Sequence, residues 1–146
     1  MFRRTTQPLI LAAALALPGL AMAAQPVIDV YKRASCGCCK EWISHLQANG
    51  FTVRAHDVED PGVVRTKGGI PEKLASCHSA TVGKYTVEGH VPASDIKRLL
   101  RERPAAAGLS VPGMPMGSPG MEGPRSDPYE VLLVKNGGTS VYKRYP

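Results

Sequence analysis

The sequence predicts an α/β fold, in which helices pack against a β-sheet. Three observations predict it. Residues 27–31, 38–49 and 51–56 read in turn as a strand, an amphipathic helix and a second strand. A second helix pattern begins at Ser94, and two strand-like runs close the chain. A chain that mixes strand and helix signals in this order is typical of the α/β class.

The first 23 residues have the organisation of a secretory signal peptide, so we do not expect them to belong to the fold. They open with a basic stretch, continue with the apolar run 9–17 and end in an Ala-x-Ala cleavage site at 21–23. The apolar run is too short to span a bilayer. We expect one domain, residues 24–146, in an oxidising compartment, which we take to be the periplasm.

Charge and hydropathy argue against two classes of protein. Removal of Arg3 and Arg4 with the leader lowers the formal net charge from +6 to +4, and no block of like charge remains. Nucleic-acid binding is therefore not expected. No second long apolar run follows the leader, so we expect no membrane insertion.

The first strand is the short apolar run 27–31, bounded by Pro26. The helix that follows has apolar side chains at helical spacing: Cys39, Trp42, Ile43 and Leu46. Asn49-Gly50 ends this helix, and residues 51–56 alternate between apolar and polar as a half-buried strand does. A crossover helix of this kind predicts that the two strands are parallel.

The middle of the chain is irregular. Residues 59–80 are rich in turn signals, with a short helix expected at 71–75. A single strand is predicted at 81–87, with His90 just past its end. The second helix is predicted to start with Ser94 as its N-cap.

Residues 104–128 contain six Pro and five Gly without any hydrophobic period, so the segment is predicted to be loop. The runs 129–134 and 139–145, on either side of Asn-Gly-Gly, predict a closing β-hairpin. The order of a βαβ unit, an irregular middle insertion, a helix and a C-terminal hairpin fits a thioredoxin-like sandwich. Such folds place a cysteine motif where the first strand turns into the first helix.

A cysteine motif stands at that place. Cys36-Gly37-Cys38-Cys39 gathers three of the four cysteines at the predicted start of the first helix. Free amides and the positive end of the helix dipole stabilise thiolates there, and a thiolate is both a redox nucleophile and a metal ligand. An alternative makes Cys39 a core residue and pairs Cys36 with Cys77 in a structural disulfide. A disulfide framework, however, usually spaces its cysteines further apart.

The four histidines fall into two groups. Cys77-His78 places a second soft donor beside an imidazole, and His90 follows a predicted strand. These are candidate metal ligands, although a buried cysteine beside a surface histidine would give the same pattern. His45 and His56 lie on the polar faces of a helix and a strand, so we expect both to be solvated.

Three methionines, Met114, Met116 and Met121, lie in the Pro/Gly-rich segment. Thioethers are soft neutral ligands that favour Cu(I). Structural zinc sites do not recruit methionine, and an iron–sulfur cluster would leave this loop idle. A hydrophobic flap or interface patch is the alternative. If the loop carries ligands, we expect it to fold back over the start of the first helix and to bring a methionine near Cys36.

Four motifs, in this order, resemble the CopG-type periplasmic copper proteins, a family long catalogued only as a metal-binding domain of unknown function. The motifs are Cys36-Gly37-Cys38-Cys39-Lys40, Ser76-Cys77-His78, Val87-Glu88-Gly89-His90-Val91-Pro92, and Gly113-Met114-Pro115 with Gly117-Ser118-Pro119-Gly120-Met121-Glu122. The resemblance implies a thioredoxin-like fold and a role in bacterial copper resistance. It also implies a Cys-x-Cys-Cys copper site that can hold more than one ion.

The resemblance extends to the ligands and to the partners. Carried over by motif, the implied thiolate ligands are Cys36, Cys38, Cys39 and Cys77. The histidines and methionines that lie in matching motifs are His78, His90, Met114, Met116 and Met121. Candidate partners are copper ions and other periplasmic copper carriers or efflux components.

Three functions remain open from the sequence. The first is a copper-binding protein that sequesters or passes on Cu(I), with or without cycling to Cu(II). The second is a thiol–disulfide oxidoreductase, with Cys36 as nucleophile and Cys39 as resolving thiol. The third is an interaction module in which the cysteines form two disulfides and the methionine loop is a docking flap.

Overall fold

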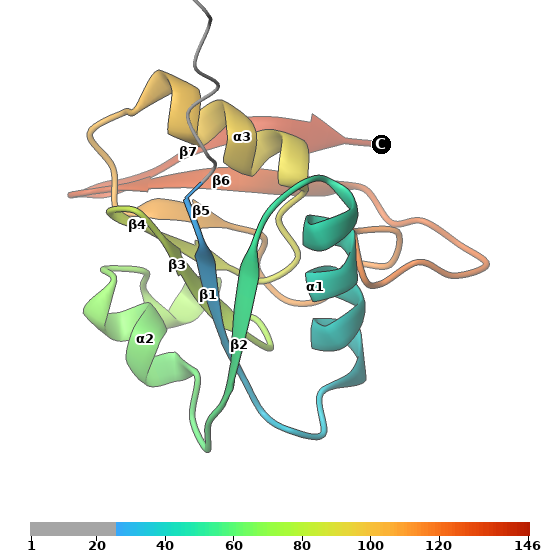
Figure 1. The fold of residues 1–146 in the computed structure, drawn as a ribbon. Coiled ribbons are helices and arrows are strands. Elements are labelled where there is room, and N and C mark those ends of the chain that lie inside the picture. The colour runs from blue at the N-terminus through green and yellow to red at the C-terminus, as the bar shows by residue number, and fades with distance from the viewer. Residues whose placement is uncertain (1–25) are drawn as a thin grey trace, which may run out of the picture.

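The computed structural model describes residues 26–146, so the predicted signal peptide lies outside the described residues. Seven strands form one mixed sheet in the order β2-β1-β3-β4-β5-β6-β7 (Figure 1). Two helices, α1 and α3, contribute side chains to one large core against the sheet. The predicted α/β class is therefore confirmed. The narrower thioredoxin-like assignment stays a prediction.

The predicted strand–helix–strand unit is present. It consists of β1 (Ile28–Lys32), α1 (Gly37–Ala48) and β2 (Val53–Asp57). The two strands are parallel, with Ile28 opposite Val53, as a crossover helix requires. The cysteine motif therefore lies where the first strand turns into the first helix, as the sequence predicts.

The middle of the chain contains a helix that the sequence does not reveal. It is α2 (Gly62–Lys67), which is followed by the 3-10 helix η1 (Glu72–Leu74). The short helix expected at 71–75 is confirmed by η1. Within α2 only Gly62 and Arg65 are buried, so this six-residue helix shows no apolar period.

The predicted single strand at 81–87 is wrong. The structure has two antiparallel strands there, β3 (Ser79–Val82) and β4 (Tyr85–Glu88). Gly83 and Lys84 form the two-residue turn between them, and Gly83 adopts a φ of +56°. The turn brings Cys77, before β3, next to His90, after β4.

Helix α3 (Ala93–Glu102) begins earlier than predicted, because Pro92 and not Ser94 is its N-cap. The side chain of Pro92 cannot cap the helix. The Ala93 amide instead donates to His45 Nε2 on α1, at 3.0 Å. The prediction that His45 is solvated is therefore wrong, and burial lowers the pKa of this imidazole.

The segment 104–128 is not loop throughout, because it contains β5 (Gly108–Ser110). This strand pairs with β4 in parallel and with β6 in antiparallel fashion. Three residues are too few to show a period, so pairing alone defines the strand. The predicted hairpin is confirmed as β6 (Tyr129–Lys135) and β7 (Gly138–Tyr145).

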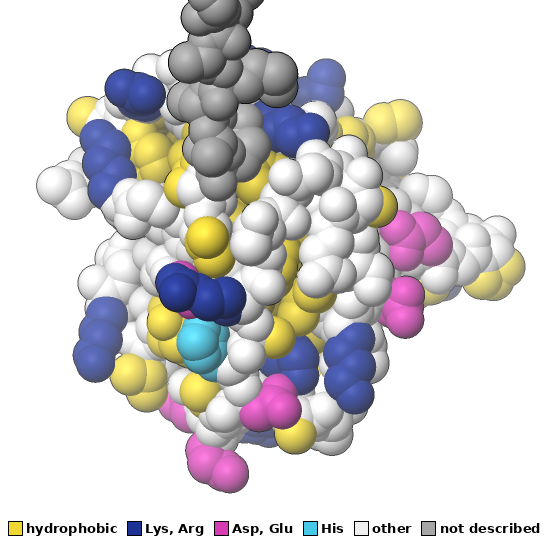
Figure 2. All heavy atoms as spheres, in the orientation of Figure 1, with side chains coloured by type: hydrophobic (Ala, Val, Ile, Leu, Met, Phe, Trp, Pro, Cys, Tyr) yellow, Lys and Arg dark blue, Asp and Glu magenta, His cyan; other side chains and the backbone are white. Residues whose placement is uncertain are grey.

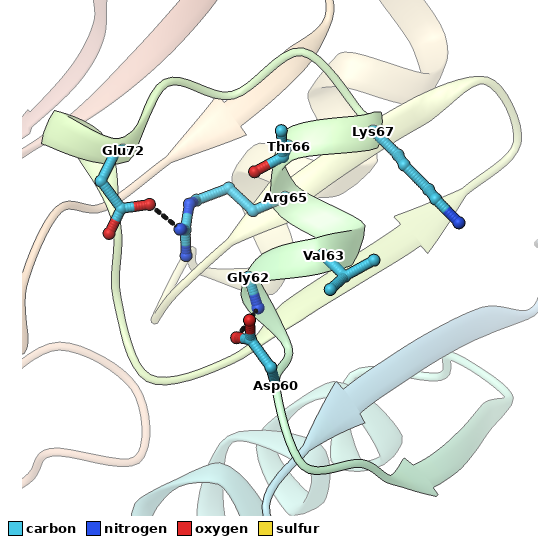
Figure 3. A pocket seen from close by; sticks show the side chains of 7 residues that line it. All are labelled: Asp60, Gly62, Val63, Arg65, Thr66, Lys67 and Glu72. Atoms are coloured by element: carbon cyan, nitrogen blue, oxygen red, sulfur yellow. Dashed lines mark hydrogen bonds and ion pairs between the residues drawn. The ribbon is translucent and has the colours of Figure 1, made fainter.

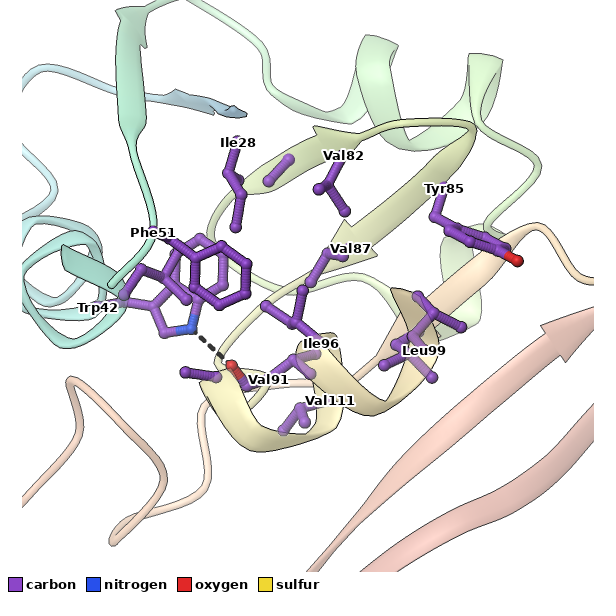
Figure 4. Close-up of a cluster of buried hydrophobic side chains, with 14 of the residues drawn as sticks. Ile28, Trp42, Phe51, Val82, Tyr85, Val87, Val91, Ile96, Leu99 and Val111 are labelled. Carbon is purple, nitrogen blue, oxygen red and sulfur yellow. Dashed lines mark hydrogen bonds between the residues drawn. The ribbon is translucent and has the colours of Figure 1, made fainter. Parts of the chain in front are cut away.

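The larger core ties the helices to the segment that carries His90. Figure 4 shows Trp42 among buried side chains from the strands and from α3. Its Nε1 donates to the carbonyl oxygen of Val91 at 2.9 Å. The middle of α1 is thereby joined to the segment after β4.

The surface carries no dominant patch of charge on the face seen in Figure 2. Lys and Arg side chains are scattered there among uncharged ones, with acidic groups between them. Within residues 26–146, none of the helices has the length and hydropathy needed to cross a bilayer.

Candidate metal centre

The four cysteines meet at the N-terminus of α1. Cys36 is the N-cap, and its Sγ accepts a hydrogen bond from the Cys39 amide at 3.3 Å. Cys38 Sγ lies 3.6 Å from Cys36 Sγ and 3.7 Å from Cys77 Sγ. Cys39 Sγ lies 3.7 Å from Cys77 Sγ. The segment before β3 thus supplies the fourth sulfur to a group that α1 begins.

Two of these cysteines are bonded to each other. Cys36 and Cys39 form a disulfide, whereas Cys38 and Cys77 are free thiols. The alternative pairing of Cys36 with Cys77 is therefore wrong. Two disulfides are not formed either, because Cys38 and Cys77 are in contact without being bonded.

Two buried imidazoles adjoin the Cys77 thiol. His78 Nδ1 lies 3.3 Å from Cys77 Sγ, and His90 Nε2 lies 3.1 Å from it. Both histidines have no exposed surface. The donor atoms of these three residues lie within 4.8 Å of one another, as do the four sulfurs. Cys77 belongs to both groups and joins them.

The hydrogen bonds of His90 define its tautomer. Its Nδ1 lies 2.8 Å from the carbonyl oxygen of Pro119, which can only accept, so Nδ1 carries the proton. The lone pair of Nε2 therefore faces Cys77. Histidine ligands of metals commonly donate their second ring N–H to a carbonyl in this way.

Burial keeps both imidazoles in the form that binds metal. It lowers the pKa of His78 to about 3, helped by the neighbouring His90, and it also lowers the pKa of His90. A neutral imidazole is the ligating form. Burial and the adjacent Cys38 raise the pKa of Cys77 to about 12, so a metal ion would have to displace its proton.

The His78 ring is held between two aromatic neighbours. Its centroid lies 4.4 Å from that of Trp42 and 5.0 Å from that of His90. Within the described residues its Nε2 has no hydrogen-bond partner, although the atom is buried. The packing therefore orients the ring, and Nδ1 is the nitrogen that contacts the Cys77 sulfur.

The methionine loop does fold back over the start of α1. A Cβ added to Gly120 would lie 2.8 Å from both the Cys38 carbonyl oxygen and the Trp42 amide nitrogen. Glycine is therefore required at the point where the loop meets the helix. Internal hydrogen bonds shape the loop, including Gly117 N to Met121 O at 2.8 Å.

The three methionines differ in exposure. Met114 is exposed, whereas Met116 and Met121 are partly buried. The loop backbone lies beside the cysteines, but whether any thioether binds a metal stays a prediction.

Sequence reasoning missed a buried carboxylate beneath the site. Glu88, the last residue of β4, has no exposed surface and accepts a hydrogen bond from the Ser76 amide at 2.7 Å. Burial raises the pKa of Glu88, against the lowering effects of hydrogen bonds from Ser79 and Ser76 and of Arg65. The signal in the sequence was weak: an acidic residue directly after the predicted strand 81–87 and two positions before His90.

A separate groove of about 410 Å³ lies beside α2, away from these ligands (Figure 3). Its lining residues are Asp60, Gly62, Val63, Arg65, Thr66, Lys67 and Glu72. Arg65 is paired with Glu72 there. The groove contains none of the predicted metal ligands and is not a second candidate for the site.

Comparisons with known proteins identify the family. The family described as "Protein of unknown function, DUF411" matches residues 74–121. Two solved structures, "Copper resistance protein copG", Form 1 and Form 2, are each 49% identical to the chain, with a TM-score of 0.78. The similarity covers 84% of this chain and 98% and 99% of theirs, respectively. The chain belongs to the CopG family.

The DUF411 match covers only part of the site. The DUF411 match begins before Cys77 and ends at Met121, so it contains both buried histidines and the methionine loop. The three cysteines of α1 lie outside that match. The comparison with curated proteins returned no match.

Proposed function

We propose that this member of the CopG family is a periplasmic copper-binding protein of copper resistance, and that it holds Cu(I) at the sulfur cluster on α1. The convergence on Cys77 carries the proposal. Its Sγ is in contact with two further sulfurs and with two neutral imidazoles. No structural role in the fold requires so many soft donors at one point.

The donor chemistry favours a soft cation. Crowded thiolates repel one another, and a bound cation relieves that repulsion. Thiolates and thioethers select Cu(I), whereas imidazoles suit both oxidation states of copper. The mixed donor set is therefore compatible with cycling between Cu(I) and Cu(II). The names of the two related structures, both copper resistance proteins, support copper over zinc.

The site would have two forms, one with the disulfide intact and one with it reduced. Reduction of the disulfide takes up two electrons and two protons and releases the thiols of Cys36 and Cys39. Four sulfurs then surround one point, and sulfurs shared between ions would let the site hold more than one copper ion. With the disulfide intact, the thiols of Cys38 and Cys77 and the two imidazoles remain.

Location and partners follow from the same proposal. A signal peptide at residues 1–23 would deliver the protein to the periplasm. Periplasmic copper carriers or efflux components would then donate copper to the site or accept it. The methionine loop, with Met114 exposed at 53%, lies at the edge of the site where a partner could exchange the ion.

Titration of the reduced protein with Cu(I) tests the proposal. The mature chain, kept anaerobic, would compete with a chromophoric Cu(I) chelator. The wild type should bind Cu(I), and a variant with Cys36, Cys38 and Cys39 all replaced by Ser should lose most of that copper. Equal copper stoichiometry in the two proteins would contradict the proposal.

The disulfide specifically favours a second candidate function, that of a thiol–disulfide oxidoreductase. Cys36 is partly exposed and Cys39 is buried, which suits an attacking thiol and a resolving thiol. This function leaves Cys77 and the buried imidazoles without a role. Strong turnover of metal-free protein in an insulin-reduction assay, with no copper bound on isolation, would favour it over the copper proposal.

A further inference from the structure

The buried carboxylate of Glu88 holds both ends of the segment that carries Cys77 and His78. Its Oε1 accepts a hydrogen bond from the Ser76 amide at 2.7 Å, and its Oε2 accepts one from the Ser79 hydroxyl. These two donors stand immediately before and immediately after the Cys77-His78 pair. An ionised carboxylate has two oxygens that only accept hydrogen bonds, so it suits a position between an amide donor and a hydroxyl donor.

Backbone contacts also link the segment 76–79 to the residues just before His90. Ser79 and Glu88 are opposite each other in the pairing of β3 with β4, and the Gly89 amide donates to the His78 carbonyl oxygen at 3.0 Å. Gly89 has a φ of +72°, and a Cβ there would lie 2.6 Å from the Cβ of Ser76. The segment therefore packs directly against the turn that leads to His90.

Stability alone does not account for a charge at this position. Arg65 Nη1 lies 3.7 Å from Glu88 Oε1, and both side chains are buried. Replacing a buried ion pair with apolar side chains of similar volume is often neutral or stabilising. The carboxylate does supply something that an apolar side chain cannot, namely two acceptors aimed at Ser76 and Ser79.

We infer that Glu88 is the positioning residue of the metal centre: through Ser76 and Ser79 it sets where Cys77 and His78 lie relative to His90. It need not touch the metal. The description of the site as a metal centre rests on the proposed function, whereas the effect of Glu88 on Cys77 can be measured without metal. Residues that orient metal ligands from outside the coordination sphere typically change metal affinity 10–100-fold when they are replaced.

The first test uses reduced, metal-free mature protein and the alkylation rate of Cys77. Trypsin cleaves after Arg33, Lys40, Lys73 and Lys84, so peptide 74–84 reports Cys77 alone and peptide 34–40 reports the other three cysteines. Glu88→Ala should raise the Cys77 rate severalfold relative to peptide 34–40, because a segment that loses both anchoring hydrogen bonds opens more often and exposes the thiol. Glu88→Gln, whose amide oxygen still accepts from Ser76, should stay closer to the wild type.

Two further variants keep the inference falsifiable. Ser79→Ala removes one of the two hydrogen bonds and keeps the buried carboxylate beside Arg65, so it remains informative if Glu88→Ala does not fold. It should raise the Cys77 rate by less than Glu88→Ala does. Val131→Ala, in the core of β6, removes buried methyl groups far along the chain from the segment and should leave the rate unchanged.

The second test measures Cu(I) affinity by chelator competition. Glu88→Ala should weaken binding about 10–100-fold, Glu88→Gln should largely restore it, and Val131→Ala should match the wild type. An unchanged Cys77 rate in both Glu88→Ala and Ser79→Ala, or an equal rise in Val131→Ala, would overturn the inference. A wild type that binds no Cu(I), together with a raised Cys77 rate in Glu88→Ala, would refute the copper proposal and leave the positioning role standing.

Discussion

His90 shows how single hydrogen bonds define the chemistry of the site. The Pro119 carbonyl oxygen accepts a hydrogen bond from Nδ1–H, and Nε2 is left facing Cys77 Sγ at 3.1 Å. The same bond ties the methionine loop to the turn after β4. One imidazole thus links a soft sulfur donor to the loop that lies over α1.

Replacement of His90 by Ala should weaken Cu(I) binding by about tenfold or more, because the change removes a neutral donor beside Cys77 and releases the loop. His56→Ala is a matched control, since His56 lies on β2 and interacts with Asp29 and Tyr31. Chelator competition measures both variants. Equal affinity in His90→Ala and the wild type would remove His90 from the ligand set.

The lowered pKa of Asp29 predicts a small change in the stability of the fold at acid pH. Hydrogen bonds from Arg54 and then His56 hold its pKa below the ordinary value of 3.8. A carboxyl whose pKa is depressed by folding stabilises the protein above its unfolded pKa, and this stabilisation is lost as the pH falls. The stability advantage of the wild type over Asp29→Asn should therefore shrink below about pH 4.

Urea denaturation between pH 6 and pH 3 measures that difference. In Arg54→Gln the free energy of unfolding should depend less on pH over this range than in the wild type, because Arg54 is the main cause of the lowered pKa of Asp29. A gap between the wild type and Asp29→Asn that stays constant over this range would contradict the assignment.

At the scale of elements, the junction between α1 and the start of α3 holds the site together. Trp42 donates to the Val91 carbonyl, and three residues further along α1 His45 accepts from the Ala93 amide. Both contacts join α1 to the residues that directly follow His90. The helix that carries three cysteines is thereby fixed to the turn that carries an imidazole.

Trp42→Phe should lower the free energy of unfolding by about 1–3 kcal/mol, because the buried Val91 carbonyl loses its partner. Urea denaturation of reduced, metal-free protein measures the change. Leu99→Met on α3 serves as a control, since it keeps the volume of a buried side chain and should cost less than about 1.5 kcal/mol. A Trp42→Phe variant as stable as the wild type would show that the bond contributes nothing.

Elements with strong local signals could be predicted from the sequence. The stripe of α1, the parallel strands beside it and the closing hairpin each have a period or a turn that identifies them. The strand β5 and the helix α2 are too short to show a hydrophobic period. The break at Gly83 was missed because strand-forming residues stand on both sides of it, and only pairing between β3 and β4 reveals two strands.

The residue types of the candidate site could be predicted from the sequence, but the contacts between those residues could not. Four cysteines, two histidines and a methionine loop stand out in the sequence because soft donors cluster there. That Cys77 is the sulfur shared by both groups depends on the β3–β4 turn. The role inferred for Glu88 depends on a hydrogen bond to Ser76, which is twelve positions away along the chain.

At the scale of the whole molecule, we expect the fold to present the same site in two redox forms, of which the structure shows the one with the disulfide. The sheet and the two helices of the larger core fix where the sulfurs meet, while the bond between Cys36 and Cys39 determines how many of them are available. Copper loading and disulfide state should therefore be coupled.

The oxidised protein should bind less copper per chain than the reduced protein, because two of its four sulfurs are occupied by the disulfide. Metal analysis after gel filtration, combined with a thiol count on the same sample, measures both quantities. Cys36→Ser with Cys39→Ser should behave like the oxidised form under all redox conditions. Equal loading in the oxidised and reduced wild type would contradict the coupling.

X-ray absorption at the copper edge of anaerobically loaded, reduced protein tests the central claim most directly. If the claim is right, the spectrum shows a Cu(I) edge with scattering dominated by sulfur and a smaller contribution from imidazole nitrogen. Failure to take up copper at micromolar concentration, or a first shell of nitrogen and oxygen without sulfur, would contradict it.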